Sequence, residues 1–225
     1  SRGLGDVYKR QVRKGGSILV SKKIAQALAG SSVIRAMFNE GKEMAARYGA
    51  ENVYDFSLGN PATPAPESVN RSIKEIVDEM DPLELHGYMS NSGYEDVRRA
   101  MAENLNRRFQ TSFDAHNIIM TVGAAGGLNI IFKTLLDPED EVIVFAPYFG
   151  EYKSYAANFD ARIVEVEPDF ASFQPDLEKF TGKITAKTKI VLVNTPNNPT
   201  GVVYTEETLQ EMAEILRKKE QELSL

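Results

Sequence analysis

Apolar residues recur along the first half of the chain with the spacing of an α-helix. Val97, Met101 and Leu105, for example, follow one another every four positions, which places them on one face of a helix. The same spacing predicts helices over 21–48 (with a break near residue 30), 68–80 and 94–109. Between the first two helices, residues 56–66 are predicted to form a short strand and a proline-rich connection.

From residue 117 onward, short apolar runs alternate with helical stretches. Ile190–Val193 holds four apolar residues, three of them β-branched, between Lys189 and a polar turn, so a buried strand is expected there. Such patterns predict strands over 117–122, 141–145, 162–166 and 189–193, and helices over 125–136, 151–158, 175–180 and 206–222. Strands that alternate with helices indicate a parallel sheet with helices on both faces. The predicted fold class is therefore α/β, with three α/β/α layers around a mainly parallel sheet.

Composition narrows the possible functions. The 225 residues carry a formal charge of -6 and form no basic stripe, which argues against nucleic acid as the main partner. The absence of cysteine excludes disulfides, cysteine-ligated zinc and thiol nucleophiles, and it fits a cytoplasmic protein. The two histidines, His86 and His116, are interpreted as surface residues rather than as a metal site. No stretch reaches the roughly 18 apolar residues of a membrane span, so no membrane partner is expected.

Both ends of the chain look foreign to the rest. Residues 6–11 resemble the in-frame translation of a transposon adaptor used in sequencing libraries, and residues 223–225 resemble the same adaptor read from the opposite strand. We therefore expect residues 1–11 and 223–225 to be adaptor-derived, and the gene to continue beyond this chain.

A turn of small residues joins the predicted strand 117–122 to the helix that follows it. Residues 121–127 read Thr-Val-Gly-Ala-Ala-Gly-Gly, and such a turn lets a ligand approach the backbone. The first N–H groups of the helix then favour an anion, most often phosphate. The turn lacks the Lys-Ser/Thr of a nucleotide P-loop and the spacing of a dinucleotide fingerprint. Tight packing of helix on sheet is an alternative reason for the small residues.

Two further strand ends carry side chains suited to a flat ligand. Phe149 follows the strand 141–145, together with Tyr148 and Tyr152, and an aromatic ring there can stack on a heterocycle unless it serves only for packing. Asn198 lies in Asn-Thr-Pro-Asn-Asn-Pro-Thr-Gly, residues 194–201, after the strand 189–193. Its amide can donate a hydrogen bond without bringing in a charge, although a structural turn would also explain it. Because ligands bind at the carboxyl edge of such sheets, these features together fit a planar, phosphorylated aromatic cofactor.

The order and spacing of these motifs resemble the class I/II aminotransferases, pyridoxal-phosphate enzymes of fold type I. The resemblance extends over nearly all of residues 21–222. Residues 57–61, Ser-Leu-Gly-Asn-Pro, are similar to the family's N-terminal signature, whose glycine, Gly59 here, lines the substrate-carboxylate pocket. Residues 88–98 are similar to the family's Tyr…Gly…Leu-Arg stretch, whose tyrosine, Tyr88 here, reaches the cofactor phosphate of the partner subunit.

The resemblance assigns roles at the three strand ends. It implies that Gly123, Ala124 and Ala125 cradle the phosphate of pyridoxal 5'-phosphate, that Phe149 stacks on the ring, and that Asn198 bonds the pyridine 3-oxygen. The peptide before Pro199 becomes a candidate cis bond. The implied activity is the transfer of an amino group between an amino acid and a 2-oxo acid, in a homodimer with the active site at the interface.

The resemblance also implies the domain plan and what the chain lacks. Residues 12–60 would form an N-terminal arm and part of the small domain, and residues 61–222 an incomplete cofactor-binding large domain, cut before the C-terminal small domain. The family's Schiff-base lysine, pyridinium aspartate and carboxylate-binding arginine all lie downstream of Asn-Pro-Thr-Gly, beyond the chain end. This chain alone is therefore predicted to be inactive. Ala124 and Ala125 replace hydroxyl or lysine side chains often found in the family's turn, so phosphate binding there would rest on backbone N–H groups and on residues further along the chain.

Other functions remain open at this point. A pyridoxal-phosphate-dependent C–S lyase or a segment of a transcription regulator would keep the fold and change the chemistry. The regulator is disfavoured because no basic helix-turn-helix module precedes residue 21. A non-enzymatic α/β binding module would make the three strand ends a coincidence.

Overall fold

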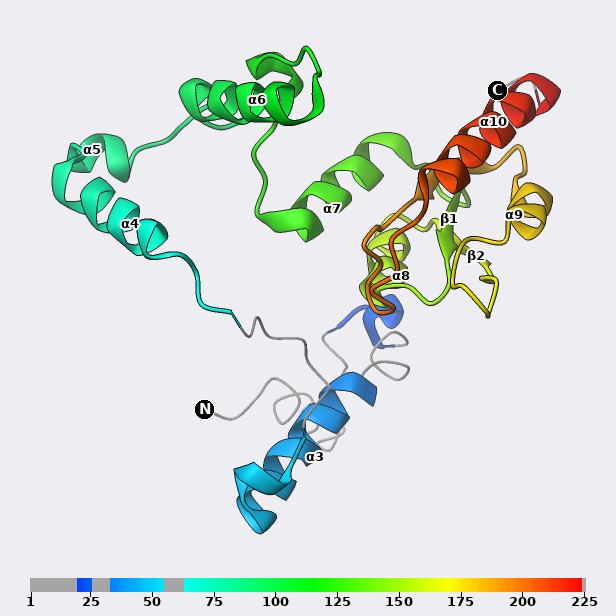
Figure 1. The fold of residues 1–225 in the computed structure, drawn as a ribbon, viewed down its shortest axis with the longest axis horizontal. Helices are drawn as coiled ribbons and strands as arrows, with labels where there is room; N and C mark the ends of the chain where they lie inside the picture. The colour runs from blue at the N-terminus through cyan, green and yellow to red at the C-terminus, as the bar shows by residue number, and fades with distance from the viewer. Residues whose placement is uncertain (1–19, 26–32, 55–62, 224–225) are drawn as a thin grey trace. The chain divides into compact units, whose positions relative to one another are not determined.

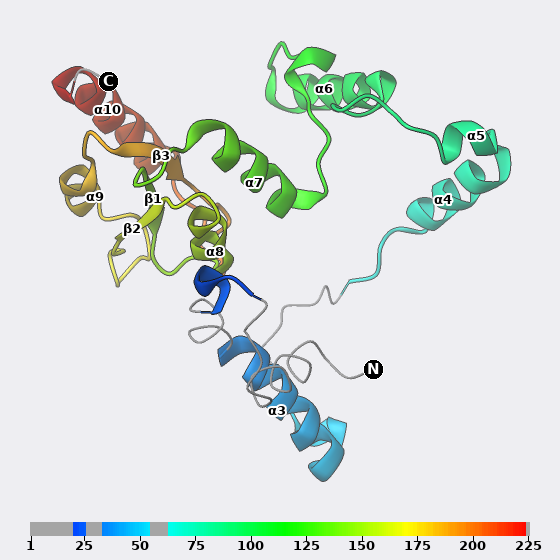
Figure 2. The same cartoon turned by 180° about the vertical axis from the view of Figure 1, so that it is seen from behind.

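The computed structural model describes residues 20–25, 33–54 and 63–223 of the 225 (Figures 1 and 2). The predicted signature at residues 57–61, with Gly59, lies outside the described residues. The chain divides into two compact units, Ser1–Gly87 and Tyr88–Leu225, which are described in turn.

In the first unit, helices form where the helical spacing predicts them. Residues 22–25 are helical, α3 spans Val33–Tyr48, and the short 3-10 helix η1 spans Ala50–Asn52. Helix α4, Glu67–Glu79, is within one residue of its predicted bounds.

The first unit also contains a four-residue helix, α5 (Pro82–Leu85), which was not predicted from the sequence. Asp81 caps it, since its Oδ1 accepts hydrogen bonds from the N–H groups of Leu83 at 2.8 Å and Glu84 at 3.2 Å. Aspartate at the cap and proline at the first position are both typical of a helix start.

The second unit is built on a parallel sheet of three strands in the order β2-β1-β3. Strands β1 (Glu141–Phe145) and β2 (Arg162–Val166) have their predicted bounds, and β3 (Thr188–Leu192) begins and ends one residue early. Phe145 is paired with Val166, and Val144 with Leu192. The carboxyl ends of all three strands therefore lie at one edge of the sheet.

Helices cover both faces of this sheet. Successive residues of β1 point to opposite faces, so its apolar side chains are buried on both sides. Val142 and Val144 pack with α7 (Gly123–Leu135) and α8 (Glu151–Ala157) through side chains such as Phe132 and Tyr152. Ile143 packs on the other face with α9 (Leu177–Lys183) and α10 (Glu206–Leu223). The predicted three-layer α/β/α arrangement with a parallel sheet is confirmed.

Helix α6 (Glu95–Phe109) packs with the 3-10 helix η2 (Ala115–Asn117). Asn106 closes the connection between them. Its Nδ2 donates to the carbonyl oxygen of Phe113 at 2.8 Å, and its Oδ1 accepts from the Phe113 N–H at 2.8 Å.

The predicted strand at 117–122 is wrong. Residues 118–122 join no ladder with the described strands, and Ile119 and Val122 are exposed. The apolar run Ile118–Met120 gives this segment a preference for extended backbone, but a strand also needs a neighbour. Among the described residues, no helix is both long and apolar enough to cross a membrane.

Candidate functional site

Two loops leave the sheet at its carboxyl edge, one after β1 and one after β3. Residues 146–150 connect β1 to α8, and residues 193–205 connect β3 to α10. Phe149 and Asn198, the predicted stacking ring and amide donor, lie in these two loops. The parallel register of β1 and β3 therefore brings the two loops out at the same edge, as predicted.

The loop after β3 is held by its own polar groups. The Asn194 Oδ1 accepts from the Asn198 N–H at 2.9 Å. The Asn197 N–H donates to the carbonyl oxygen of Val202 at 2.8 Å, and the Asn197 Oδ1 accepts from the Thr200 Oγ1 at 2.9 Å. The peptide between Asn198 and Pro199 is cis, as predicted. The sequence motif contained Asn194 and Asn197, but no role was predicted for either.

Tyr204 fastens the far end of this loop to the core. Its ring is buried and meets Phe145 edge-on, with 6.2 Å between the ring centroids. Its N–H donates to the Thr195 Oγ1 at 2.9 Å. Burial raises the pKa of Tyr204, and a side-chain hydrogen bond with Asn197 opposes this in part, so the phenol stays neutral at physiological pH.

Asn198 faces outward from the loop. Its side chain is exposed and makes no hydrogen bond to any other residue that the structure describes. The amide is therefore available to a ligand oxygen, which fits the predicted role.

Phe149 sits at the start of α8. Its carbonyl oxygen accepts from the Tyr152 N–H at 3.1 Å, and its ring meets the Tyr152 ring edge-on at 5.6 Å between centroids. Tyr152 is buried, while Phe149 is 39% exposed. Both predicted roles of these aromatics, packing and stacking on a ligand, are therefore possible: Tyr152 packs in the core, and Phe149 keeps part of its ring accessible.

Tyr148, beside Phe149, is tied to the neighbouring strand. Its hydroxyl donates to the Glu165 Oε1 at 2.5 Å, and the Lys153 Nζ lies 2.9 Å from the same oxygen. The hydrogen bond from Tyr148, followed by that from Lys153, lowers the pKa of Glu165. Burial, and then the bond to Glu165, raises the pKa of Tyr148. Sequence reasoning missed this contact because Glu165 is 17 residues away.

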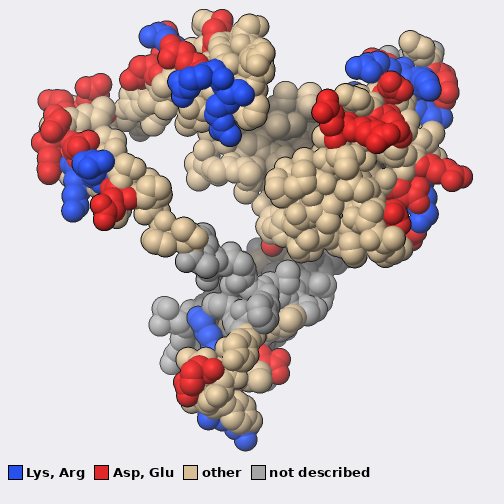
Figure 3. Space-filling view, viewed as in Figure 1, with Lys and Arg blue, Asp and Glu red and all other residues tan. Residues whose placement is uncertain are grey.

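The carboxyl edge is free of charged side chains in both loops. Residues 142–150 and 190–205 contain no lysine, arginine, aspartate or glutamate. Figure 3 shows a broad uncharged area over α8 and the loop after β3, bordered by acidic residues at the start of α10. Such a surface suits a flat neutral ring, and an anionic group would have to be bound by backbone N–H groups.

Gly123 opens helix α7 with a φ of +66°. A Cβ at this position would meet nothing within 4 Å, and no side chain caps the helix start. Ala124 and Ala125 follow and are exposed. The Gly123 N–H donates to the carbonyl oxygen of Thr121 at 2.9 Å. The helix start therefore leaves the next N–H groups, those of Ala124 and Ala125, for an anion.

Close contact requires a small residue at Gly127, but its neighbour is the turn residue Thr121 and not the sheet. A Cβ at Gly127 would lie 3.3 Å from the Thr121 Oγ1, so only a small residue fits easily there. The same hydroxyl donates to the carbonyl oxygen of Gly123 at 3.0 Å. Thr121 therefore shapes the turn, a role that the sequence reasoning did not assign.

Tyr88, the predicted contact to the partner's phosphate, is fully exposed. The residues present fit pyridoxal phosphate in kind: an open helix start, an accessible aromatic ring and an accessible amide. The assignment of Gly123, Ala124, Ala125, Phe149, Asn198 and Tyr88 to one ligand stays a prediction.

Comparison with known proteins gives consistent matches. A sequence profile described as Aminotransferase class I and II matches residues 50–222. The aspartate aminotransferase of Thermotoga maritima is 32% identical over 202 residues, which cover 89% of this chain and 52% of that protein. A probable aspartate/prephenate aminotransferase of Thermus aquaticus is 41% identical over 161 residues, covering 71% of this chain and 41% of that protein.

A solved structure agrees with these matches. The crystal structure of an aminotransferase from Eubacterium rectale superposes with a TM-score of 0.88 at 45% identity, covering 92% of this chain and 52% of that one. The present chain thus spans about half the length of the relatives that it matches.

Proposed function

Because this chain belongs to the class I and II aminotransferase family, we propose that the whole protein uses pyridoxal phosphate to move an amino group between an amino acid and a 2-oxo acid. One observation carries the proposal. The parallel strands β1 and β3 are followed by uncharged loops at one edge of the sheet, one with an accessible ring and the other with an accessible amide. A flat cofactor needs both.

Each predicted residue would hold a different part of the cofactor. The turn of Gly123, Ala124 and Ala125 would hold the phosphate, chiefly through the N–H groups of Ala124 and Ala125, because the Gly123 N–H is bonded to the Thr121 carbonyl oxygen. The ring of Phe149 would cover one face of the pyridine ring, and the amide of Asn198 would donate to its 3-oxygen. When bound, the cofactor supplies an electron-withdrawing ring that stabilises negative charge at the amino acid's α-carbon.

The loop contacts explain how Asn198 would keep its orientation. Asn194 and Asn197 use their side-chain oxygens within the loop, and Tyr204 fixes the loop to the buried Phe145. The amide of Asn198 is thus presented on a backbone that is already ordered, so less conformational entropy is lost when it binds a ligand.

Several properties belong to the proposed whole protein. We propose a homodimer in which Tyr88 binds the phosphate held by the partner subunit and Gly59 lines the carboxylate pocket. We also propose a cytoplasmic location. The relatives are named for different substrates, aspartate in one case and aspartate or prephenate in another. The proposed substrate class is therefore kept to amino acids and 2-oxo acids. We expect the 225-residue chain alone to be inactive, because the family's lysine lies downstream of Asn198-Pro199.

Titration of the full-length protein with pyridoxal phosphate tests the proposal. We expect a visible absorbance band that borohydride abolishes, and transfer of the amino group from an amino acid to an added 2-oxo acid. A protein that binds no cofactor would refute the proposal. Release of ammonia and a thiol without amino transfer would identify the C–S lyase instead.

A matched pair of asparagine variants tests the site itself. Asn198→Ala should weaken cofactor binding and shift the dependence of the cofactor's absorbance on pH. Asn70→Ala removes an exposed amide from helix α4 and should change neither. Identical absorbance curves for the Asn198→Ala and wild-type proteins would count against the assignment.

A further inference from the structure

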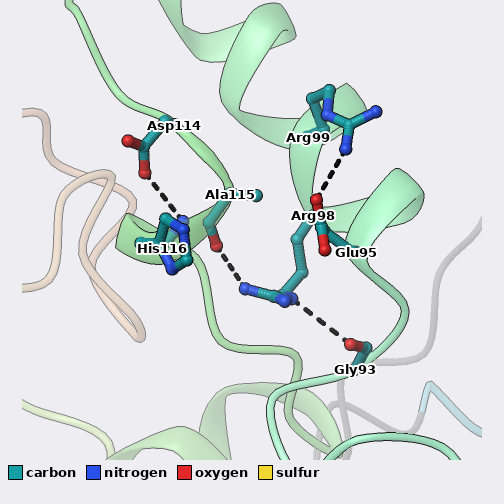
Figure 4. A network of polar contacts seen from close by, with 7 residues as sticks. All are labelled: Gly93, Glu95, Arg98, Arg99, Asp114, Ala115 and His116. Carbon is teal, nitrogen blue, oxygen red and sulfur yellow. Dashed lines mark hydrogen bonds and ion pairs between the residues drawn. The ribbon is translucent and has the colours of Figure 1, made fainter.

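Arg98 is the only charged residue that is buried among the described residues, with 9% of its surface exposed. It lies on α6 and reaches toward η2 (Figure 4). Its Nη1 donates to the carbonyl oxygen of Ala115 at 2.5 Å, and its Nε donates to the carbonyl oxygen of Gly93 at 3.3 Å. One side chain therefore joins two backbone segments that are 22 residues apart in the sequence.

The neighbouring acidic side chains have other partners, as Figure 4 shows. Glu95 forms an ion pair with Arg99 at 2.7 Å, and the Asp114 Oδ1 accepts from the His116 N–H at 2.7 Å. The Arg98 guanidinium thus donates to main-chain carbonyls of Gly93 and Ala115. A buried charge is costly unless hydrogen bonds compensate it, and the planar guanidinium can reach two acceptors at a fixed spacing.

Both carbonyls belong to segments that lead to predicted phosphate-binding residues. Gly93 closes a turn in which its N–H donates to the carbonyl oxygen of Ser90 at 2.9 Å, and Tyr88 lies just before this turn. Ala115 begins the segment that runs into Gly123 at the start of α7.

A second set of contacts joins the same two segments. The Met120 N–H donates to the carbonyl oxygen of Ser92 at 3.0 Å. Gly93 has a φ of +96°, and a Cβ there would lie 2.6 Å from the Met120 Cγ. The turn after Tyr88 thus rests directly on the segment before Gly123, and Arg98 fastens the two together on the side of α6.

We infer that Arg98 is a positioning residue that sets the turn carrying Tyr88 against the segment carrying Gly123, so that both can bind phosphate. This inference rests on the proposed function. In the proposed homodimer, Gly123 would serve the cofactor of its own subunit and Tyr88 that of the partner. The two hydrogen bonds from Arg98 to the Gly93 and Ala115 carbonyls, here called the Arg98 clamp, would therefore link the phosphate contacts of two active sites.

The test compares pyridoxal phosphate with pyridoxal, which lacks the phosphate, as ligands of the full-length apoprotein. Arg98→Met should weaken the binding of pyridoxal phosphate about tenfold while leaving pyridoxal binding nearly unchanged. Arg99→Met is the matched control, because Arg99 is exposed and pairs only at the surface with Glu95, and it should change neither affinity. Equal weakening of both ligands would indicate a merely structural role and would overturn the inference.

A double-mutant cycle adds a readout that general loosening of the fold would not give. Tyr88→Phe should change the dissociation rate of pyridoxal phosphate less in the Arg98→Met protein than in the wild type, because the turn that carries Tyr88 is already displaced. Additive effects would overturn the inference. If Arg98→Met does not fold, Arg98→Lys decides the question. A single ammonium group cannot reproduce the geometry of a guanidinium that bonds two carbonyls. The ratio of pyridoxal to pyridoxal-phosphate affinity in the Arg98→Lys protein should therefore change in the direction expected for Arg98→Met.

Failure of this inference can be told apart from failure of the proposed function. If Asn198→Ala weakens cofactor binding but the Arg98 variants leave the affinity ratio unchanged, only the positioning role is rejected. If Asn198→Ala also leaves binding unchanged, the cofactor site itself is rejected.

Discussion

Asn197 and Asn198 are adjacent in the sequence and have opposite environments. Asn197 is 6% exposed, and its Oδ1 accepts hydrogen bonds from the Thr200 N–H at 3.2 Å and the Thr200 Oγ1 at 2.9 Å. Asn198 is exposed, and only its backbone N–H is bonded, to Asn194. Asn197 therefore stabilises the loop, and the loop leaves the side chain of Asn198 accessible.

This contrast predicts different defects for two otherwise identical substitutions. Asn197→Ala should lower the free energy of unfolding by about 1–3 kcal/mol, because the N–H and hydroxyl of Thr200 lose a buried acceptor. Asn198→Ala should change it by less than about 0.5 kcal/mol. Urea denaturation of the two variants measures both values, and equal destabilisation would contradict the assignment of roles.

Gly93→Ala should destabilise the chain by about 1–3 kcal/mol. The backbone there has a φ of +96°, and the new Cβ would collide with the Met120 side chain. The matched control is Gly182→Ala in helix α9, where a Cβ would meet nothing within 4 Å. That change should be neutral or stabilising by up to about 1 kcal/mol. Thermal unfolding of both variants checks the sign of each effect.

Tyr148→Phe should reduce stability at neutral pH and lose that effect in acid. The Tyr148 hydroxyl is the first cause of the lowered pKa of Glu165. A lowered carboxyl pKa adds stability above its ordinary value of 4.5, and the added stability is lost as the pH falls through the folded value. The difference should not exceed about 1 kcal/mol, because the Glu165 side chain is 47% exposed and solvent weakens the interaction.

Urea midpoints of the wild-type and Tyr148→Phe proteins between about pH 7 and about pH 3 test this dependence. Tyr155→Phe in helix α8 is the control, since it removes a nearby tyrosine hydroxyl that does not bond Glu165. A stability difference between wild type and Tyr148→Phe that stays constant over the range would contradict the coupling to Glu165.

Phe132→Ala should cost about 3 kcal/mol or more of unfolding free energy. Phe132 is fully buried between α7 and the sheet, where it packs with β1 and α8. The adjacent Ile131 is 47% exposed, so Ile131→Ala should cost much less. Comparable losses for the two variants would mean that α7 does not pack on the sheet as described.

Much of the fold could be predicted because its signals are local. The strands β1 and β2 are short, mainly apolar runs that each begin at a charged residue, and each was predicted with its observed bounds. Helix α10 begins after Thr205, whose Oγ1 accepts from the Thr208 N–H at 3.1 Å, as its capping residue predicts. The family was also predicted correctly, because its motifs occur in order along the chain.

Pairing of distant segments could not be predicted in the same way. Residues 117–122 contain a short apolar run of the kind that predicts a strand, yet no described strand lies beside them. The Arg98 clamp and the contact of Tyr148 with Glu165 depend on which segments meet in space. Nothing in the local pattern of a helix shows which of its arginines is buried, as Arg98 and Arg99 illustrate.

The candidate site was predicted in its residues but not in its supports. Phe149 and Asn198 lie in loops at one sheet edge because parallel strands end at the same edge. Thr121, which shapes the turn at Gly123, and Asn197 and Tyr204, which hold the loop after β3, were assigned no role from the sequence. Their contributions come from hydrogen bonds and ring contacts that only the folded chain reveals.

Strand β1 is covered on both faces and flanked on both edges, with Val142, Ile143 and Val144 fully buried. Its amide protons can meet solvent only when both hydrophobic layers separate. Hydrogen exchange in β1 should therefore report global unfolding, while the loops at the sheet edge exchange through local opening. A ligand bound at that edge would slow exchange in β1 only by the amount by which it stabilises the whole domain.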